Sequence, residues 1–156
     1  MQNNPTLFQI CQKIVVFDEQ NQTVLLARRK GEADLDGLYS FIGGKLETTD
    51  NGITAGLDRE KTEEIGTQAK LTIFPEVSWN TFFIKKDGNQ MFLPHYYARY
   101  DGGEIQLNTQ EYADYKWVKI SELEQFEPKI PNIPHTVTIL KKLHAVDEKK
   151  RGVLKY

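Results

Sequence analysis

Three glutamates stand close together near the middle of the sequence, at Glu60, Glu63 and Glu64. On a helix, positions i, i+3 and i+4 share one face, so these carboxylates are expected to project together. Like charges at this spacing destabilise a helix by about 0.2–0.5 kcal/mol for each pair, so a compensating cation is expected. Arg59 is one candidate, and Mg²⁺ or Mn²⁺, which prefer oxygen ligands, is the other. The spacing therefore leaves two interpretations open: a metal site or a solvated acidic face.

Two adjacent glycines, Gly43 and Gly44, precede the glutamates. Without a Cβ, this backbone can approach an ion or a phosphate closely. Followed by REKTEEIG, which ends at Gly66, the Gly-Gly pair resembles the Nudix box of the Nudix hydrolase family. The stretch GLYSFIGGKLE also resembles the segment that usually leads into that box. The resemblance favours the metal site over the solvated face.

The stretch departs from the family pattern at supporting positions. Asp50 stands where the family has an isolated glutamate, and one extra residue separates it from Arg59. Lys61 and Thr67 occupy positions that are usually apolar, and Ile42 replaces a proline. None of these changes affects the three clustered glutamates.

The resemblance implies a fold and a set of roles. The fold would be α+β, a Nudix-type α/β/α sandwich in which helices flank a mixed β-sheet. Glu60, Glu63 and Glu64 would hold Mg²⁺ or Mn²⁺ together with the backbone carbonyl of Gly43. Arg59 would orient the carboxylates, and Asp50 would support the loop. Which carboxylate acts as the general base is left open.

Three basic residues are candidates for binding substrate phosphates. Arg28 and Arg29 end a predicted strand at a place where the family often has a phosphate-binding arginine. Lys45 follows the glycine pair and could contact phosphate or pair with Glu47. A solvated strand end is the alternative for the two arginines.

A further acidic residue, Glu111, precedes the predicted strand that ends at Trp117. Many Nudix enzymes place a loop glutamate there as a base or an extra metal ligand, and Glu104 and Asp114 compete for this role.

Several strand aromatics could stack on a base, although such residues belong more often to the core. They are Trp79, Phe82, Tyr96 and Tyr97. The three histidines lack the spacing of a metal site and are interpreted as structural or surface residues. They are His95, His135 and His144.

The elements expected to position these residues alternate between strands and helices. The predicted strands are 8–17, 23–28, a short extended piece before Gly43, 71–86, 90–100 and 111–120. The main helix is predicted at 53–65, with N-cap side chains from Thr49, Asp50 or Asn51 and a closing Gly66. A short helix with a capping box between Ser121 and Glu124 and a C-terminal helix at 134–143 follow. The tail at about 147–156 is expected to fray.

Length and charge set limits on the partners. The 156 residues fit one domain, spanning 1–156, and the net charge of −2 provides no positive field to recruit nucleic acid or anionic lipid. A small-molecule nucleotide is the predicted partner, with neither nucleic acid nor membrane, and a homodimer is left open. The single cysteine, Cys11, excludes an internal disulfide and is interpreted as a buried strand residue. With no signal peptide recognisable, a cytoplasmic location is expected.

The predicted activity is metal-dependent hydrolysis at the diphosphate linkage of a nucleoside diphosphate derivative. The family's ADP-ribose, NADH and coenzyme A signatures are missing, and Thr81 and Phe82 stand where the first would have a proline. By exclusion, a (deoxy)nucleoside triphosphate or modified nucleotide is the expected substrate of this Nudix pyrophosphohydrolase. The alternatives are a hydrolase of a nucleotide-sugar or other diphosphate, and a non-catalytic Nudix domain that senses a nucleotide. An isopentenyl diphosphate isomerase would need a catalytic cysteine, and Cys11 does not match that position.

Overall fold

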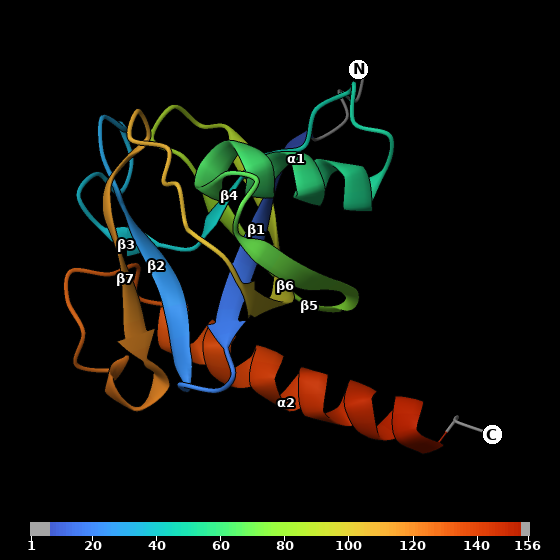
Figure 1. Ribbon diagram of the computed structural model, residues 1–156. Coiled ribbons are helices and arrows are strands. Elements are labelled where there is room, and N and C mark those ends of the chain that lie inside the picture. Colours follow the sequence, from blue (N-terminus) through green and yellow to red (C-terminus); the bar gives the residue numbers. More distant parts are fainter. Residues whose placement is uncertain (1–6, 154–156) are drawn as a thin grey trace.

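The computed structural model describes residues 7–153 and is built around a mixed sheet of seven strands (Figure 1). In this part of the chain β1 and β6 pair in parallel, whereas every other strand pair is antiparallel. The strand order is β3-β2-β1-β6-β5, with β4 also paired to β1 and β7 also paired to β2. The strands are β1 (Phe8–Asp18), β2 (Thr23–Arg29), β3 (Tyr39–Ser40), β4 (Ile42–Lys45), β5 (Lys70–Ile84), β6 (Gln90–Gly102) and β7 (Tyr112–Lys119).

Two helices, α1 (Ile53–Ile65) and α2 (Ile133–Val153), cover the sheet from opposite sides (Figure 1). Successive residues of a strand point to opposite faces, and β1 divides its apolar side chains accordingly. Ile14 and Val16 belong to the core that contains residues of α1. Val15 and Phe17 belong to the core that contains residues of α2. The structure therefore confirms the predicted α/β/α sandwich with a mixed sheet.

Helix α1 has the bounds that the sequence predicts, but it begins differently. Its C-cap is Gly66, which has a φ of 84° and donates its N–H to the carbonyl oxygen of Thr62. The predicted side-chain N-cap is wrong, since Gly52 occupies that position and no side chain caps the helix. Asp50 instead accepts hydrogen bonds from the N–H of Glu47 and from Arg59. The loop uses this carboxylate to hold itself together, so it is not available to cap α1.

The C-terminal part contains two further corrections. A 3-10 helix, Ile120–Glu122, stands where a capped helix at 121–126 was predicted, and no side-chain cap or capping box forms there. Helix α2 begins at Ile133 and continues to Val153, so residues 147–153 are helical where fraying was predicted. Glu148, Lys149 and Lys150 in this stretch have a high helix propensity, which favours the longer element. The remaining tail residues, 154–156, lie outside the described residues.

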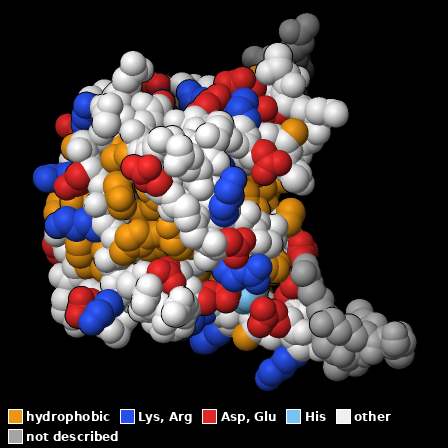
Figure 2. Space-filling model, in the orientation of Figure 1, with side chains coloured by type: hydrophobic (Ala, Val, Ile, Leu, Met, Phe, Trp, Pro, Cys, Tyr) orange, Lys and Arg blue, Asp and Glu red, His pale blue; other side chains and the backbone are white. Residues whose placement is uncertain are grey.

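The short strand β4 places the glycine pair beside β1. Its antiparallel register sets Gly43 opposite Lys13 and Gly44 opposite Gln12. The loop after β4 then leads directly into α1, so the glycines and the helical glutamates lie at the same end of the sheet. On the face shown in Figure 2, acidic and basic side chains are interspersed, in keeping with the small net charge. Neither described helix has the length and apolarity that crossing a membrane requires.

Candidate active site

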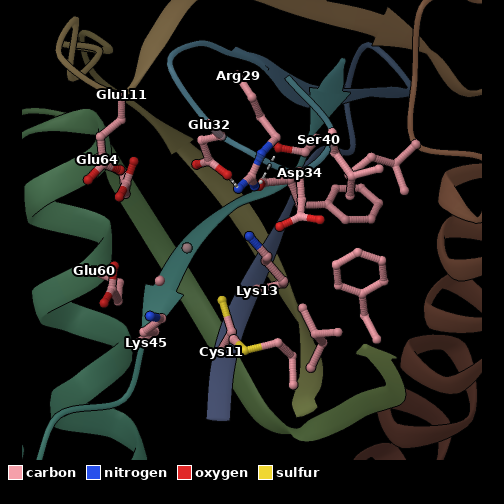
Figure 3. A pocket seen from close by; sticks show the side chains of 18 of the residues that line it. Cys11, Lys13, Arg29, Glu32, Asp34, Ser40, Lys45, Glu60, Glu64 and Glu111 are labelled. Carbon is pink, nitrogen blue, oxygen red and sulfur yellow. Dashed lines mark hydrogen bonds and ion pairs between the residues drawn. The ribbon is translucent and has the colours of Figure 1, made fainter. Parts of the chain in front are cut away.

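A cavity of about 730 Å³ opens between α1, β4 and the neighbouring strands (Figure 3). This volume is in the range of sites that bind small molecules. Its lining brings together most of the side chains and the backbone position that the sequence nominates. They are Arg29, Gly43, Lys45, Arg59, Glu60, Glu63, Glu64 and Glu111.

Of the three basic residues nominated for phosphate binding, Arg28 does not line this cavity. Its Nε donates to the carbonyl oxygen of Gly37 at 3.0 Å, and its guanidinium lies over the ring of Tyr39. Arg29, the next residue on β2, points to the other face, as strand alternation requires, and pairs with Glu32. Of the two arginines, the structure therefore places only Arg29 at the cavity.

The glycine pair allows β4 to pass close to its neighbours. Gly43 has a φ of 137°, in the region that favours glycine, and a Cβ there would overlap the backbone carbonyl of Gln12. A Cβ at Gly44 would overlap the Glu60 carboxylate. Gly43 therefore needs glycine for its backbone conformation and its close approach to Gln12, whereas a side chain at Gly44 would displace the Glu60 carboxylate.

Arg59 forms ion pairs with several acidic side chains at one side of the cavity. Its Nε lies 2.7 Å from Oδ1 of Asp50, and its Nη1 lies 2.9 Å from Oε1 of Glu60 and 3.1 Å from Oε2 of Glu63. Its Nη2 donates to the carbonyl oxygen of Lys45 at 3.0 Å, which ties α1 to the end of β4. Hydrogen bonds from Arg59 and from the backbone of Glu47 lower the pKa of Asp50 to about 2. The predicted Arg59–Glu63 pair forms within this larger network.

Glu64 has very different surroundings from Glu63. It is 3% exposed, and its Oε2 has no hydrogen-bond partner among the described residues. Burial raises the pKa of Glu64 to about 8, and the neighbouring Glu111 adds to that shift. Burial also raises the pKa of Glu60, although Arg59 opposes the effect. We call Glu60, Glu64 and Glu111 the inner end of the cluster, and among the described residues these three carboxyl groups have a single ion-pair partner, Arg59.

The donor chemistry of this inner end fits a hard divalent cation. Glu60, Glu64 and Glu111 offer carboxylate oxygens, and the partnerless Oε2 of Glu64 leaves one of them free for a ligand. Within residues 7–153, no three His, Cys, Asp or Glu side chains converge as a ready-made metal site. One reason is that Glu60 forms a salt bridge with Arg59, which holds this carboxylate toward the arginine.

Of the three acidic candidates in the later loop and strand, Glu111 alone lines this cavity. Asp114 accepts a hydrogen bond from the Tyr39 hydroxyl at 3.0 Å, and Glu104 is absent from the lining. Among the aromatic candidates, Phe82 lines the cavity and is 66% exposed. Tyr96 and Tyr97 are core residues, and Trp79 packs against His135.

Sequence reasoning missed Lys13, which is buried and lines the cavity, and it placed His95 outside the functional residues. A signal for Lys13 exists in the sequence. It interrupts the apolar strand FQICQKIVVF at a position whose parity matches Val15 and Phe17, which predicts an inward-facing charge. Cys11 is buried as predicted and also lines the cavity.

Comparison with known proteins gives relatives of two kinds. The NAD-capped RNA hydrolase NudC of Haemophilus influenzae is 30% identical over 142 residues, which cover 89% of this chain and 48% of that protein. The chain thus spans about half the length of the curated relatives it matches. The MutT protein of Methanosarcina mazei Go1 has a TM-score of 0.69 at 18% identity, covering 93% of this chain and 99% of the other. A C. elegans Ap4A hydrolase has a TM-score of 0.66 at 17% identity, covering 90% and 98%.

The solved structures, which are under 25% identical, show that the fold is shared. The curated relative is a hydrolase by name, which agrees with the predicted pyrophosphohydrolase. The model of the NUDIX domain matches residues 8–138, which include the whole sheet, the glycine pair and α1. The chain therefore belongs to the NUDIX family.

Proposed function

We propose that the protein is a metal-dependent hydrolase that cleaves the diphosphate linkage of a nucleoside diphosphate derivative. The observation that carries the proposal is the buried carboxylate Glu64, which lies beside Glu111 and has one oxygen without a hydrogen-bond partner among the described residues. An ionised buried carboxylate next to a second carboxylate is costly without a cation, and a site that binds Mg²⁺ uses such oxygens. Membership of the NUDIX family supports the same reaction class.

The residues that would hold the metal are Glu60, Glu64 and Glu111, with the carbonyl of Gly43 as a backbone ligand. A divalent cation, when bound, neutralises diphosphate charge and lowers the pKa of a water molecule. Arg59 is the residue that positions this set, because it binds Glu60 and also the backbone of β4. Glu63 extends the network on the solvent side, with 52% of its side chain exposed.

Substrate phosphates would be bound by cations at the rim of the cavity. Lys45 follows the glycine pair and lines the cavity without an ion-pair partner in the described part of the chain. Arg29 also lines the cavity, and its salt bridge to Glu32 fixes the direction of its guanidinium. An ammonium and a guanidinium are suited to phosphate oxygens, the second through two parallel hydrogen bonds.

The substrate class is proposed from two sources. Sequence features favour a (deoxy)nucleoside triphosphate or a modified nucleotide, as in MutT-type enzymes. The relatives named as NAD-capped RNA hydrolases favour a dinucleotide diphosphate, free or at the end of an RNA. A nucleotide-sugar remains in the same reaction class, since the bond broken is again a diphosphate linkage.

The test is to incubate the purified chain and Mg²⁺ with dGTP, ATP, NAD, an NAD-capped RNA, ADP-ribose and UDP-glucose. We expect hydrolysis of at least one, with a nucleoside monophosphate among the products and pyrophosphate released from a triphosphate. Primary release of inorganic phosphate would contradict cleavage within the diphosphate. Tight binding of one of these compounds with no turnover would support the alternative of a nucleotide-sensing domain.

A further inference from the structure

Lys13 is a charged residue inside the sandwich. It lies on β1 between Gly43 of β4 and His95 of β6, which are its cross-strand neighbours. Because Ile14 and Val16 face α1, Lys13 faces the side of the sheet that α2 covers. The residue is only 7% exposed, and Figure 3 shows its side chain directed into the cavity. A cation is therefore placed on the far side of β4 from the glutamates of α1.

The ammonium of Lys13 has no hydrogen bond or ion pair with any described residue. His95 beside it provides no charge, because burial lowers its pKa to about 4 and the charge of Lys13 adds to the shift. Asp34 lines the same cavity, yet its Oδ1 accepts the backbone N–H of Lys86 and it forms no salt bridge with Lys13. Lys13 is little exposed as a residue, yet its Nζ is not among the buried polar atoms that lack a partner, so the ammonium opens into the cavity. A molecule that occupies the cavity can therefore accept its hydrogen bonds in place of water.

The cavity connects Lys13 to the carboxylates around the glycine pair. Gly43 and Gly44 line the cavity and carry no side chains, so β4 leaves this passage open. In Figure 3, β4 runs between Lys13 on one side and Glu60 and Glu64 on the other. A molecule whose diphosphate lies at the carboxylates would therefore extend its attached group toward Lys13. The walls there are largely apolar and include Phe41, Met91, Leu93 and Ile133.

We propose that Lys13 determines substrate specificity by donating hydrogen bonds to an oxygen acceptor on the group attached to the diphosphate. The inference rests on the proposed function for the position of that diphosphate. An ammonium donates and cannot accept, so it favours a carbonyl oxygen over an amino group. The oxygen can belong to a nucleobase ring or to an anionic substituent. The apolar walls favour the ring, because a flat base covers them while presenting its carbonyl edge to Lys13.

The experiment measures binding without metal, so that hydrolysis is not needed for the result. Isothermal titration calorimetry compares the wild type, Lys13→Met and Lys119→Met, the same change at an exposed strand lysine away from the cavity. The ligands form matched pairs in which a carbonyl oxygen on the base replaces an amino group. The pairs are IMP against AMP and UMP against CMP. A third pair, UDP-glucuronate against UDP-glucose, changes the substituent from neutral to anionic.

We expect the wild type and Lys119→Met to prefer the oxygen-bearing member of the ring pairs by about 10-fold or more. Lys13→Met should bind both members equally. A preference confined to the glucuronate pair, and lost in Lys13→Met, supports the same donor role with an anionic acceptor. Unchanged selectivity in Lys13→Met, or no binding of any of the six ligands by the wild type, overturns the inference.

Thermal unfolding provides a second readout that a structural lysine would not give. Because the Lys13 ammonium makes no hydrogen bond or ion pair with a described residue, and Lys13→Met keeps the length of the side chain, the melting temperature of this variant should equal or exceed that of the wild type. A clear fall in melting temperature would assign Lys13 a structural role and overturn the inference. Hydrolysis by the wild type, measured separately with Mg²⁺, tests the proposed function and does not enter either result.

Discussion

Glu63 and Glu64 are adjacent in the sequence and have opposite electrostatic environments. Glu63 is half exposed, and its Oε2 lies 3.1 Å from Nη1 of Arg59. Glu64 is buried beside Glu111, with an unpartnered oxygen and a pKa raised to about 8 by burial first and Glu111 second. One end of the carboxylate cluster is thus neutralised by the protein, and the other is not.

The difference shows that helical spacing alone does not decide which glutamate needs a metal. The deciding neighbour of Glu63 is Arg59 on the same helix, whereas that of Glu64 is Glu111, which is far away in the sequence. Arg59 turns toward the loop that contains Asp50, whereas Glu111 reaches the inner end from the segment before β7. A metal is needed most where protein cations are absent, which is at Glu64.

Metal removal should have the largest effect. Exhaustive treatment with EDTA is expected to abolish hydrolysis of any substrate found in the panel, and added Mg²⁺ or Mn²⁺ should restore it. The cause is that, among the described residues, Glu64 and Glu111 have no ion-pair partner to replace the metal. Initial rates before and after chelation measure this, and full activity in chelated protein would contradict the mechanism.

The two glutamates should differ next in turnover. Glu64→Gln is expected to lower kcat by at least about 10²-fold, the size associated with losing electrostatic stabilisation of a transition state. Glu63→Gln, a matched change one residue away, should lower it by less than about 10-fold, because Arg59 keeps its bonds to Asp50 and Glu60. Equal losses of kcat in the two variants would show that the different surroundings of Glu63 and Glu64 do not affect catalysis.

In metal-free protein, the pH dependence of the free energy of unfolding should distinguish Glu64 from Glu63. The folded-state pKa of Glu64, about 8, lies above the unfolded value near 4.5, so the folded state binds the extra proton. Stability is therefore fully present below about pH 4.5 and falls as the pH rises toward 8, by an amount on the order of a few kcal/mol. Glu64→Gln should remove this slope, and Glu63→Gln should keep it. Chemical denaturation at several pH values, in the presence of EDTA, measures both.

The sequence predicted the fold well because its elements follow from local patterns, and most of the nominated site residues line one cavity. The bounds of α1 follow from the glutamate spacing and from Gly66, a residue able to adopt the positive φ of a helix end. The strands follow from runs of β-branched and apolar residues, and their observed ends differ from the predicted ones by only a few residues.

The remaining features depend on contacts that no local pattern contains. Asp50 could cap α1 or bind Arg59, and only the folded loop shows that it binds Arg59. Arg28 and Arg29 point to opposite faces of β2, as the alternation of side chains along a strand requires. Lys13 belongs to no motif, and its importance depends on the absence of a described partner within the fold.

The smallest expected effect concerns the stability of Glu63→Gln without metal. The Arg59–Glu63 pair is exposed, and arginine precedes glutamate at i, i+4, the less favourable order on a helix. Its loss should cost only about 0.3–0.5 kcal/mol at low ionic strength and nothing measurable at about 1 M salt, where such pairs are screened. Glu64→Gln should instead stabilise metal-free protein at pH 8, because it removes a buried carboxylate from beside Glu111. Urea denaturation of both variants at low and high salt measures the two signs. A stabilised Glu63→Gln protein would mean that repulsion among the glutamates outweighs the contact with Arg59, and the two ends of the cluster would then be electrostatically alike.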